Sequence, residues 1–171
     1  MNATKNETTP DFLRRTGTCY EGSKWALRTS GAMAGVWDAC TRFDWLVWML
    51  KNLKEPVDEH TRLAIRYAAL RIVRETPLHD GRRLWDVLNA PTRAAFCTAL
   101  RYLDGMATIE ELAAANATFA ERAEGDAADM AIYASAYADA YADAARVRKS
   151  PAARAFHVRT LKEAVPNPFL P

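Results

Sequence analysis

The side chains best suited to chemistry are few, and their spacing matches no catalytic or metal-binding pattern. They are three histidines and three cysteines: His60, His79, His157, Cys19, Cys40 and Cys97. The histidines lack the close spacing of helical zinc ligands, and the chain has neither a glycine-rich phosphate loop nor a Gly-x-Ser-x-Gly turn. The sequence therefore predicts no catalytic residue, no cofactor site and no metal site, and we expect a protein that is not an enzyme.

Two weaker combinations of reactive residues remain. Asp58-Glu59 and Glu110-Glu111 are adjacent acids, but neighbours along a helix point to different faces and seldom form a catalytic pair. Cys40 and His60 could meet in space as a nucleophile and its base. An enzyme of this kind would need an isolated pocket that holds a cysteine together with a histidine.

The cysteines and the apolar runs indicate a cytoplasmic protein. Three is an odd number and no Cys-x-x-Cys pair occurs, so we expect buried, reduced thiols. The longest apolar run covers residues 45–50, far short of the roughly 20 residues that cross a bilayer. The N-terminus shows no apolar segment of the kind found in a secretion signal. We therefore expect a cytoplasmic protein with no membrane partner.

Charge falls into three blocks along the chain, whose total net charge is +2. Residues 1–103 carry a net charge of +5, residues 104–143 carry −8, and residues 144–171 carry +5. Such an asymmetry is typical of a binding face or of complementary surfaces within one fold. We expect the acidic block to present a helical face to a basic protein partner. Its candidate contacts are Glu110, Glu111, Glu121, Glu124, Asp126 and Asp129.

The arginines of residues 62–83 offer an alternative partner. Together with the basic C-terminal segment they could neutralise the phosphates of a nucleic acid, which supply much of its affinity for proteins. A helix turns by about 100° per residue, however, so Arg62, Arg66, Arg71 and Arg74 spread around it and form no narrow stripe. Pairing of these arginines with the acidic block inside the fold explains both patterns equally well.

Helix signals recur along the chain, and no strand or hairpin signal stands out. Alanine is abundant and glycine is scarce, with seven residues, which favours helix over sheet. Thr108-Ile-Glu-Glu111 spells a capping box, and Ser150-Pro151 opens a last helix that ends before Pro166. We therefore expect an all-α fold, a compact single-domain bundle of eight or nine helices whose tryptophan-rich N-terminal half forms the core.

The chain length of 171 residues suits one domain. We expect a flexible N-terminal arm over residues 1–17, a single helical domain over residues 18–164, and an extended, proline-rich tail over residues 165–171. The arm is polar and lacks periodicity, although Phe12 and Leu13 could anchor it.

Two aromatic patterns bear on binding. The five tryptophans could form a ligand cage or a base-stacking platform, but their helical spacing among aliphatic residues favours core packing. They are Trp25, Trp37, Trp45, Trp48 and Trp85. Tyrosines recur every four residues among alanines, at positions 133, 137 and 141, and form a ridge beside a small-residue seam. This seam can pack within the chain or between two copies, so the sequence is compatible with either a monomer or a homodimer.

The segment from Trp25 to Leu50 resembles the small all-helical immunity-protein domains of bacteria and their phages. The likeness rests on Val36-Trp37-Asp38-Ala39-Cys40, Phe43-Asp44-Trp45-Leu46-Val47-Trp48, Leu63–Ala68 and the Ala/Tyr/Asp-rich run of residues 127–145. Phe43 departs from the pattern, because the family favours glycine there. The resemblance covers about residues 19–145, and its Asp-Trp-x-x-Trp element is its more specific part.

The resemblance implies inhibition of a toxin or effector by direct binding, with no catalytic residues. Because members occur in phage genomes, it also implies a counter-defence role, such as that of an anti-CRISPR protein. We therefore expect a non-enzymatic inhibitor that binds its partner stoichiometrically through the acidic helical face. The expected partner is a toxin or a CRISPR or other defence effector with a basic surface.

Overall fold

The computed structural model describes residues 7–17, 19–115 and 150–170, and within these ranges the chain forms nine α-helices. They are α1 (Thr9–Thr16), α2 (Tyr20–Thr29), α3 (Met33–Ala39), α4 (Phe43–Lys51), α5 (Glu59–Glu75), α6 (Leu84–Val87), α7 (Ala90–Leu103), α8 (Ile109–Ala115) and α10 (Pro151–Ala164). These described ranges contain no strand, only isolated β-bridges such as the one between Thr8 and Ala32. The expected all-α fold is confirmed.

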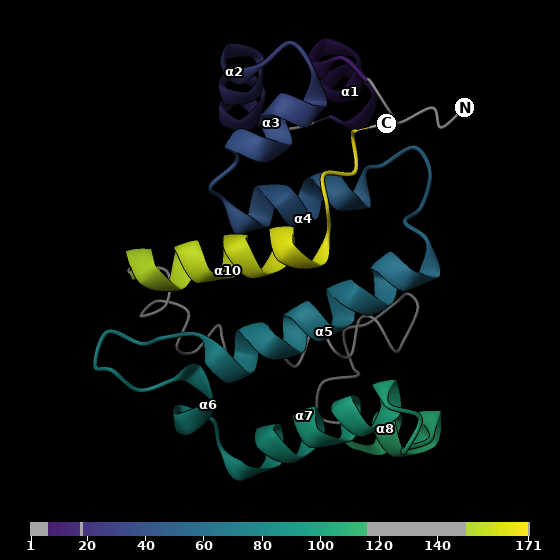
Figure 1. Ribbon diagram of the computed structural model, residues 1–171, viewed down its shortest axis with the longest axis vertical. Helices are drawn as coiled ribbons and strands as arrows, with labels where there is room; N and C mark the ends of the chain where they lie inside the picture. The colour runs from purple at the N-terminus through teal and green to yellow at the C-terminus, as the bar shows by residue number, and fades with distance from the viewer. Residues whose placement is uncertain (1–6, 18, 116–149, 171) are drawn as a thin grey trace.

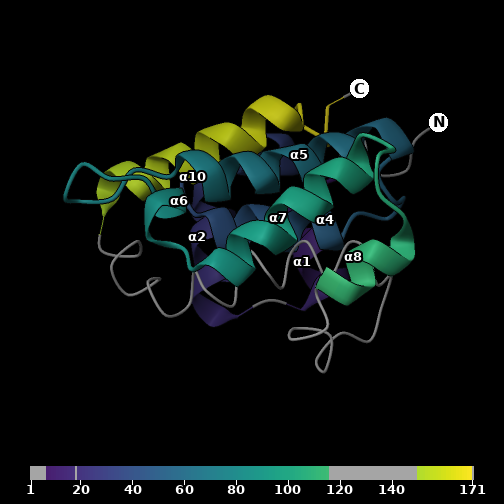
Figure 2. The same ribbon diagram turned by 90° about the horizontal axis from the view of Figure 1, so that it is seen from below.

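The helices are stacked in tiers, with the C-terminal helix in the middle of the stack (Figure 1). α1, α2 and α3 form one end, then come α4, α10 and α5, and α6, α7 and α8 form the other end. α10 packs against both α4 and α5, and α8 folds back from the end of α7 (Figure 2). None of the helices in the described ranges is both long and apolar enough to span a bilayer.

The first hydrophobic core joins α1 to α4 with the start of α5 and with α10. Its aromatic rings meet edge to face: the Phe12 centroid lies 5.3 Å from that of Trp48 and 5.6 Å from that of Phe169. Trp37 is only 1% exposed and packs beside Phe169. Such rings bury about 150–250 Å² each, so they dominate the stability of this end of the molecule.

The second hydrophobic core lies between α5, α6, α7 and α8. Leu70 and Val73 of α5 pack there with Phe96 of α7 and Leu112 of α8, and Ala153 of α10 completes the cluster. The tryptophan-rich half therefore supplies one of two cores rather than the whole core. α5 and α10 contribute to both clusters and so hold the two ends of the stack together.

The arm expected over residues 1–17 is replaced, from residue 7 onward, by an anchored helix. Thr8 Oγ1 caps α1 by accepting the N–H of Asp11 at 3.3 Å. Phe12 of this helix is fully buried. The nearly buried carboxylate of Glu7 lies 3.0 Å from Arg15 Nη2 and 3.0 Å from Lys54 Nζ. A cap, a buried ring and a paired buried acid thus fix a segment that lacks obvious periodicity.

The tail expected to be extended over residues 165–171 is also part of the core. Its described residues 165–170 are not helical, but they include a turn in which the Leu170 N–H donates to the Asn167 carbonyl at 3.3 Å. Val165 and Phe169 are each 1% exposed. Asn167 Nδ2 donates 2.9 Å hydrogen bonds to the Ala34 carbonyl and to Asp38 Oδ1, which attaches the tail to α3. The helical domain expected over residues 18–164 therefore extends in both directions along the chain.

Candidate binding surface

The two described residues of the predicted acidic face lie in the first turn of α8. Glu110 and Glu111 are both exposed there. The predicted capping box is confirmed: Thr108 Oγ1 accepts the N–H of Glu111 at 3.2 Å, and Glu111 Oε2 accepts the N–H of Thr108 at 2.7 Å. The remaining candidate contacts fall outside the described residues: Glu121, Glu124, Asp126 and Asp129. The predicted tyrosine ridge at positions 133, 137 and 141 falls outside them too.

Glu110 and Glu111 differ in what they can offer a partner. Glu111 already caps α8, and its Oε1 lies 3.7 Å from Arg101 Nη2. The ion pairs among the described residues do not involve Glu110. Hydrogen bonds from its own backbone N–H and from the Thr108 hydroxyl lower the pKa of the Glu110 carboxyl, so this side chain stays charged. Glu110 is therefore the acid of α8 best placed to meet a cation on another molecule.

Backbone and side-chain bonds hold the corner between α7 and α8. Gly105 adopts φ 71°, a left-handed conformation that suits glycine. The Met106 N–H donates to the Arg101 carbonyl at 2.6 Å, and Arg101 Nη2 donates back to the Met106 carbonyl at 3.0 Å. Leu112, which is 1% exposed, anchors α8 in the second core. These hydrogen bonds and the buried Leu112 therefore hold the backbone of the corner in place.

Large apolar side chains are exposed at the same corner. Met106 is 62% exposed, Ile109 is 44% exposed, and Tyr67 of α5 is 38% exposed. The Tyr67 hydroxyl donates a 2.7 Å hydrogen bond to Asp104 Oδ1, which brings α5 to this corner. We call Tyr67, Asp104, Met106, Ile109 and Glu110 the corner surface. Apolar side chains gathered at the surface often mark a site of interaction.

The apolar part of the corner surface was not predicted from the sequence. The available signal was the Asp104-Gly105 helix stop followed at once by Met106, because a turn between two helices exposes its side chains. Tyr67 carried no such signal. It sits in the middle of an expected helix, and only the packing of α5 against α7 brings it beside Asp104.

Several arginines of α5 pair with acids of α5 itself and of α10. Arg62 Nη1 lies 3.1 Å from Glu59 Oε2. Arg71 bridges two acids, with Nε 3.1 Å from Glu75 and Nη1 2.8 Å from Glu163 of α10. The described structure thus shows internal pairing of this helix, but with acids outside the block of residues 104–143.

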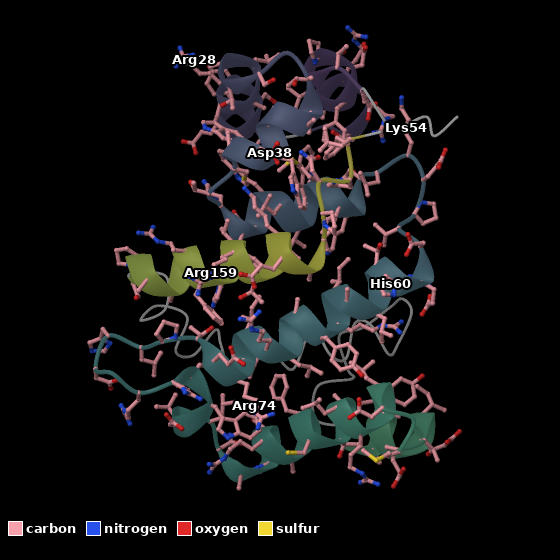
Figure 3. All side chains as sticks on the ribbon, viewed as in Figure 1. Arg28, Asp38, Lys54, His60, Arg74 and Arg159 are labelled. Atoms are coloured by element: carbon pink, nitrogen blue, oxygen red, sulfur yellow. The ribbon has the colours of Figure 1, made fainter. Side chains whose placement is uncertain are left out.

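The other cations are spread over the height of the molecule. Arg28 lies on α2, Lys54 lies after α4, Arg74 lies on α5 and Arg159 lies on α10 (Figure 3). Nucleic-acid binding by the region of residues 62–83 would be favoured by a continuous stripe of unpaired cations. The described residues do not present such a stripe on α5, because Arg62 and Arg71 are paired.

Cys40 and His60, considered as a reactive pair, lie in different environments, one buried and one exposed. The Cys40 thiol is buried and donates to the Arg42 carbonyl at 3.4 Å, while burial raises its pKa and keeps it protonated. His60 is exposed in the first turn of α5. His157 lies with Nε2 2.7 Å from Thr76 Oγ1, and burial lowers its pKa to about 4. Across the described ranges, no three His, Cys, Asp or Glu side chains are grouped to hold a metal ion.

Two thiols expected to be buried are instead exposed. Cys19 sits at the N-cap of α2, where its Sγ accepts the N–H of Gly22 at 3.4 Å. The first N–H groups of a helix have no partner within the helix, and here the thiol of an exposed residue supplies one. Cys97 lies on the exposed side of α7, next to the buried ring of Phe96. Only Cys40 among the three matches the expectation of a buried thiol.

Three tryptophans line a pocket of about 290 Å³ between α1, α2, α3 and α4. Trp25, Trp45 and Trp48 are only partly buried, and all three border this space. The Trp25 and Trp45 centroids are 5.0 Å apart, with their planes tilted by 49°. The Arg42 guanidinium stacks 4.2 Å from the Trp45 centroid and pairs with Asp44 at the pocket. The expected core packing holds for these rings too: Trp37 is buried in the first core, and Trp25, Trp45 and Trp48 are partly buried and pack against it.

The chain matches no protein-family model, no curated protein and no solved structure.

Proposed function

We propose that this protein acts by binding another protein stoichiometrically, with no chemistry of its own, and that the corner surface is part of the contact. One observation carries the proposal. Met106 and Ile109 are 62% and 44% exposed beside the charged Glu110, on a corner that is otherwise held by hydrogen bonds and a buried anchor.

The chemistry of the corner surface suits a protein partner with basic residues. Burying apolar area releases about 25 cal/mol per Å², so covering Met106 and Ile109 favours association. Methionine and tyrosine are enriched in the cores of protein interfaces, and charged side chains are more common at their rims. Glu110 would then lie at the rim and meet a lysine or arginine of the partner, which favours fast association and the correct orientation.

The charge of the sequence supports the same partner. Residues 104–143 carry a net charge of −8, and four of the five residues of the corner surface lie at the start of this block. An acidic surface of this kind is suited to occupy a groove that evolved to hold nucleic acid. The resemblance to immunity-protein domains supports a toxin or a CRISPR or other defence effector as the partner. On this proposal the protein is an immunity or anti-CRISPR-like inhibitor.

Site-specific photo-crosslinking in the native host tests this proposal. A benzophenone amino acid placed at position 106 of the full chain should form a covalent adduct with one protein, which mass spectrometry then identifies. The same residue placed at position 27 is the matched control, because Leu27 of α2 is 54% exposed at the other end of the stack. We expect the adduct at position 106 and no adduct with that protein at position 27.

Three outcomes would contradict the proposal. Equal yields of the same adduct at positions 106 and 27 would show that the partner contacts this protein without preferring the corner surface. Crosslinks to nucleic acid at position 106 would favour the alternative partner. A complete lack of adducts at position 106, with the variant still folded by circular dichroism, would remove the corner surface from any interface.

A further inference from the structure

We propose that the tryptophan-lined pocket binds a small, flat aromatic molecule of one or two fused rings that carries an N–H or O–H donor. The pocket is formed by residues of α1 to α4 and the turn between α1 and α2. It lies at the opposite end of the stack from the corner surface, so this proposal does not depend on the proposed function (Figure 1).

The size of the pocket sets the size of the ligand. An apolar cavity of about 150 Å³ in another protein stays dry and accepts a benzene molecule. The present pocket has about 290 Å³, and it therefore has room for two fused rings. Gly17 and Gly22 border it without side chains, which helps to keep this space open.

The walls of the pocket favour an aromatic ligand. Three indole rings, Trp25, Trp45 and Trp48, stand among the aliphatic and sulfur side chains of residues such as Met33 and Met49. Aromatic rings prefer offset or edge-to-face contacts with centroids about 4.5–7 Å apart, and the thioether of methionine also packs well against rings. The tilt of 49° between Trp25 and Trp45 leaves ring faces and edges that a third ring can contact.

One charged group defines the polar part of the ligand. Asp44 is the charged side chain among the described residues that line the pocket. Arg42 binds it through both oxygens, with Nε 3.1 Å from Oδ1, and so neutralises its charge. A carboxylate has about four lone-pair sites, and Arg42 occupies two of them. Asp44 can therefore accept one more hydrogen bond from a neutral ligand, and a cationic ligand is not required.

Nuclear magnetic resonance of the five indole N–H groups tests the proposal, with indole as the probe and the full chain labelled with nitrogen-15. We expect saturable shifts of the Trp25, Trp45 and Trp48 resonances. The resonance of Trp85 should stay in place, because this residue packs against Phe96 in the second core. Linear, unsaturated shifts, or equal shifts at Trp85, would overturn the proposal.

Two further comparisons test the location of the binding site and the role of the ligand's N–H donor separately. Ala26→Phe places a ring in the pocket from α2, so the indole shifts should be lost while the resonance of Trp85 and the melting temperature report an intact fold. Retained binding in a folded Ala26→Phe protein would contradict the assigned pocket. Methylation of the probe nitrogen removes its donor, and 1-methylindole should bind more weakly by about 2- to 10-fold. Equal affinities of the two probes would overturn the role of Asp44.

Discussion

Tyr67 and Asp104 are joined by a 2.7 Å hydrogen bond from the tyrosine hydroxyl to Oδ1, across 37 positions of the sequence. This bond attaches the middle of α5 to the residue that ends α7. It also raises the pKa of Tyr67 above its ordinary value, so the phenol remains a donor. The corner surface is thus held by two helices that are distant in sequence.

Tyr67→Phe should loosen the corner without unfolding the protein. The variant keeps the ring and removes the donor, so residues 104–111 lose one of their attachments. We expect faster amide hydrogen exchange in that segment, measured by mass spectrometry, with little change in α1 to α4. Tyr20→Phe is the control, because Tyr20 is 77% exposed on α2. Unchanged exchange at residues 104–111 would show that the bond does not stabilise the corner.

Phe12→Ala and Phe169→Ala should each lower the free energy of unfolding by about 3–5 kcal/mol, because both rings are buried and each leaves a cavity. Urea denaturation measures the effect. The losses of unfolding free energy should not be additive in the double variant, since the two rings pack together with their centroids 5.6 Å apart. Leu170→Ala is the control, because Leu170 is 50% exposed and should change stability by less than about 1 kcal/mol. If Phe12→Ala had no larger effect than this control, α1 would not belong to the core.

Acidification should destabilise the fold through His157. Burial lowers its pKa from 6.5 to about 4, so between these values the unfolded chain binds a proton that the folded chain does not. Stability should therefore fall as the pH drops through this window, by up to about 3 kcal/mol in total. Urea denaturation at several pH values measures this slope.

His157→Gln should flatten the slope between pH 6.5 and pH 4, whatever its stability at neutral pH. His60→Gln should retain the slope of the original protein, because His60 is exposed. An unaltered slope in His157→Gln would mean that another group causes the acid sensitivity.

Two buried threonines should respond oppositely to replacement by valine. Thr160 Oγ1 is buried, and within the described residues it has no hydrogen-bond partner. Thr160→Val should therefore raise the free energy of unfolding by about 1 kcal/mol. Thr76 Oγ1 donates to the Ile72 carbonyl at 2.5 Å and also contacts His157 Nε2. Thr76→Val should lower stability by about 1–3 kcal/mol. Equal effects of the two substitutions in thermal unfolding would contradict these assignments.

Much of the helical pattern could be predicted, because local signals decide where helices begin and end. Thr108 with Glu111, Ser150 with Pro151 and Asn89 with Pro91 each start a helix as their residue types indicate. α1 was not predicted, although Thr8 caps it and a proline lies in its first turn, because the burial of its apolar face depends on tertiary contacts. Phe12 is buried by Phe169, which lies near the other end of the chain, and no local pattern reveals that contact.

The candidate surface was predicted less completely than the fold. The acidic residues were visible as a block of charge, and Glu110 and Glu111 are indeed exposed. Their different roles were not visible, since the ion pair of Glu111 with Arg101 depends on the angle between α7 and α8. For a similar reason the sequence left a ligand cage of tryptophans as the less favoured alternative to core packing. The spacing of Trp45 and Trp48 places both on one helix face, but whether that face is filled or hollow depends on how α2 packs against it.

The most direct test of the proposed function compares Glu110→Lys with Glu21→Lys in binding to the protein captured by crosslinking. Each acid is exposed and is the second residue of its helix. The two substitutions therefore have the same effect on net charge and a similar effect on the start of a helix. Isothermal titration calorimetry should give one-to-one binding, weakened about tenfold or more by Glu110→Lys and little changed by Glu21→Lys. Equal affinities of the two variants would contradict a contact through the corner surface.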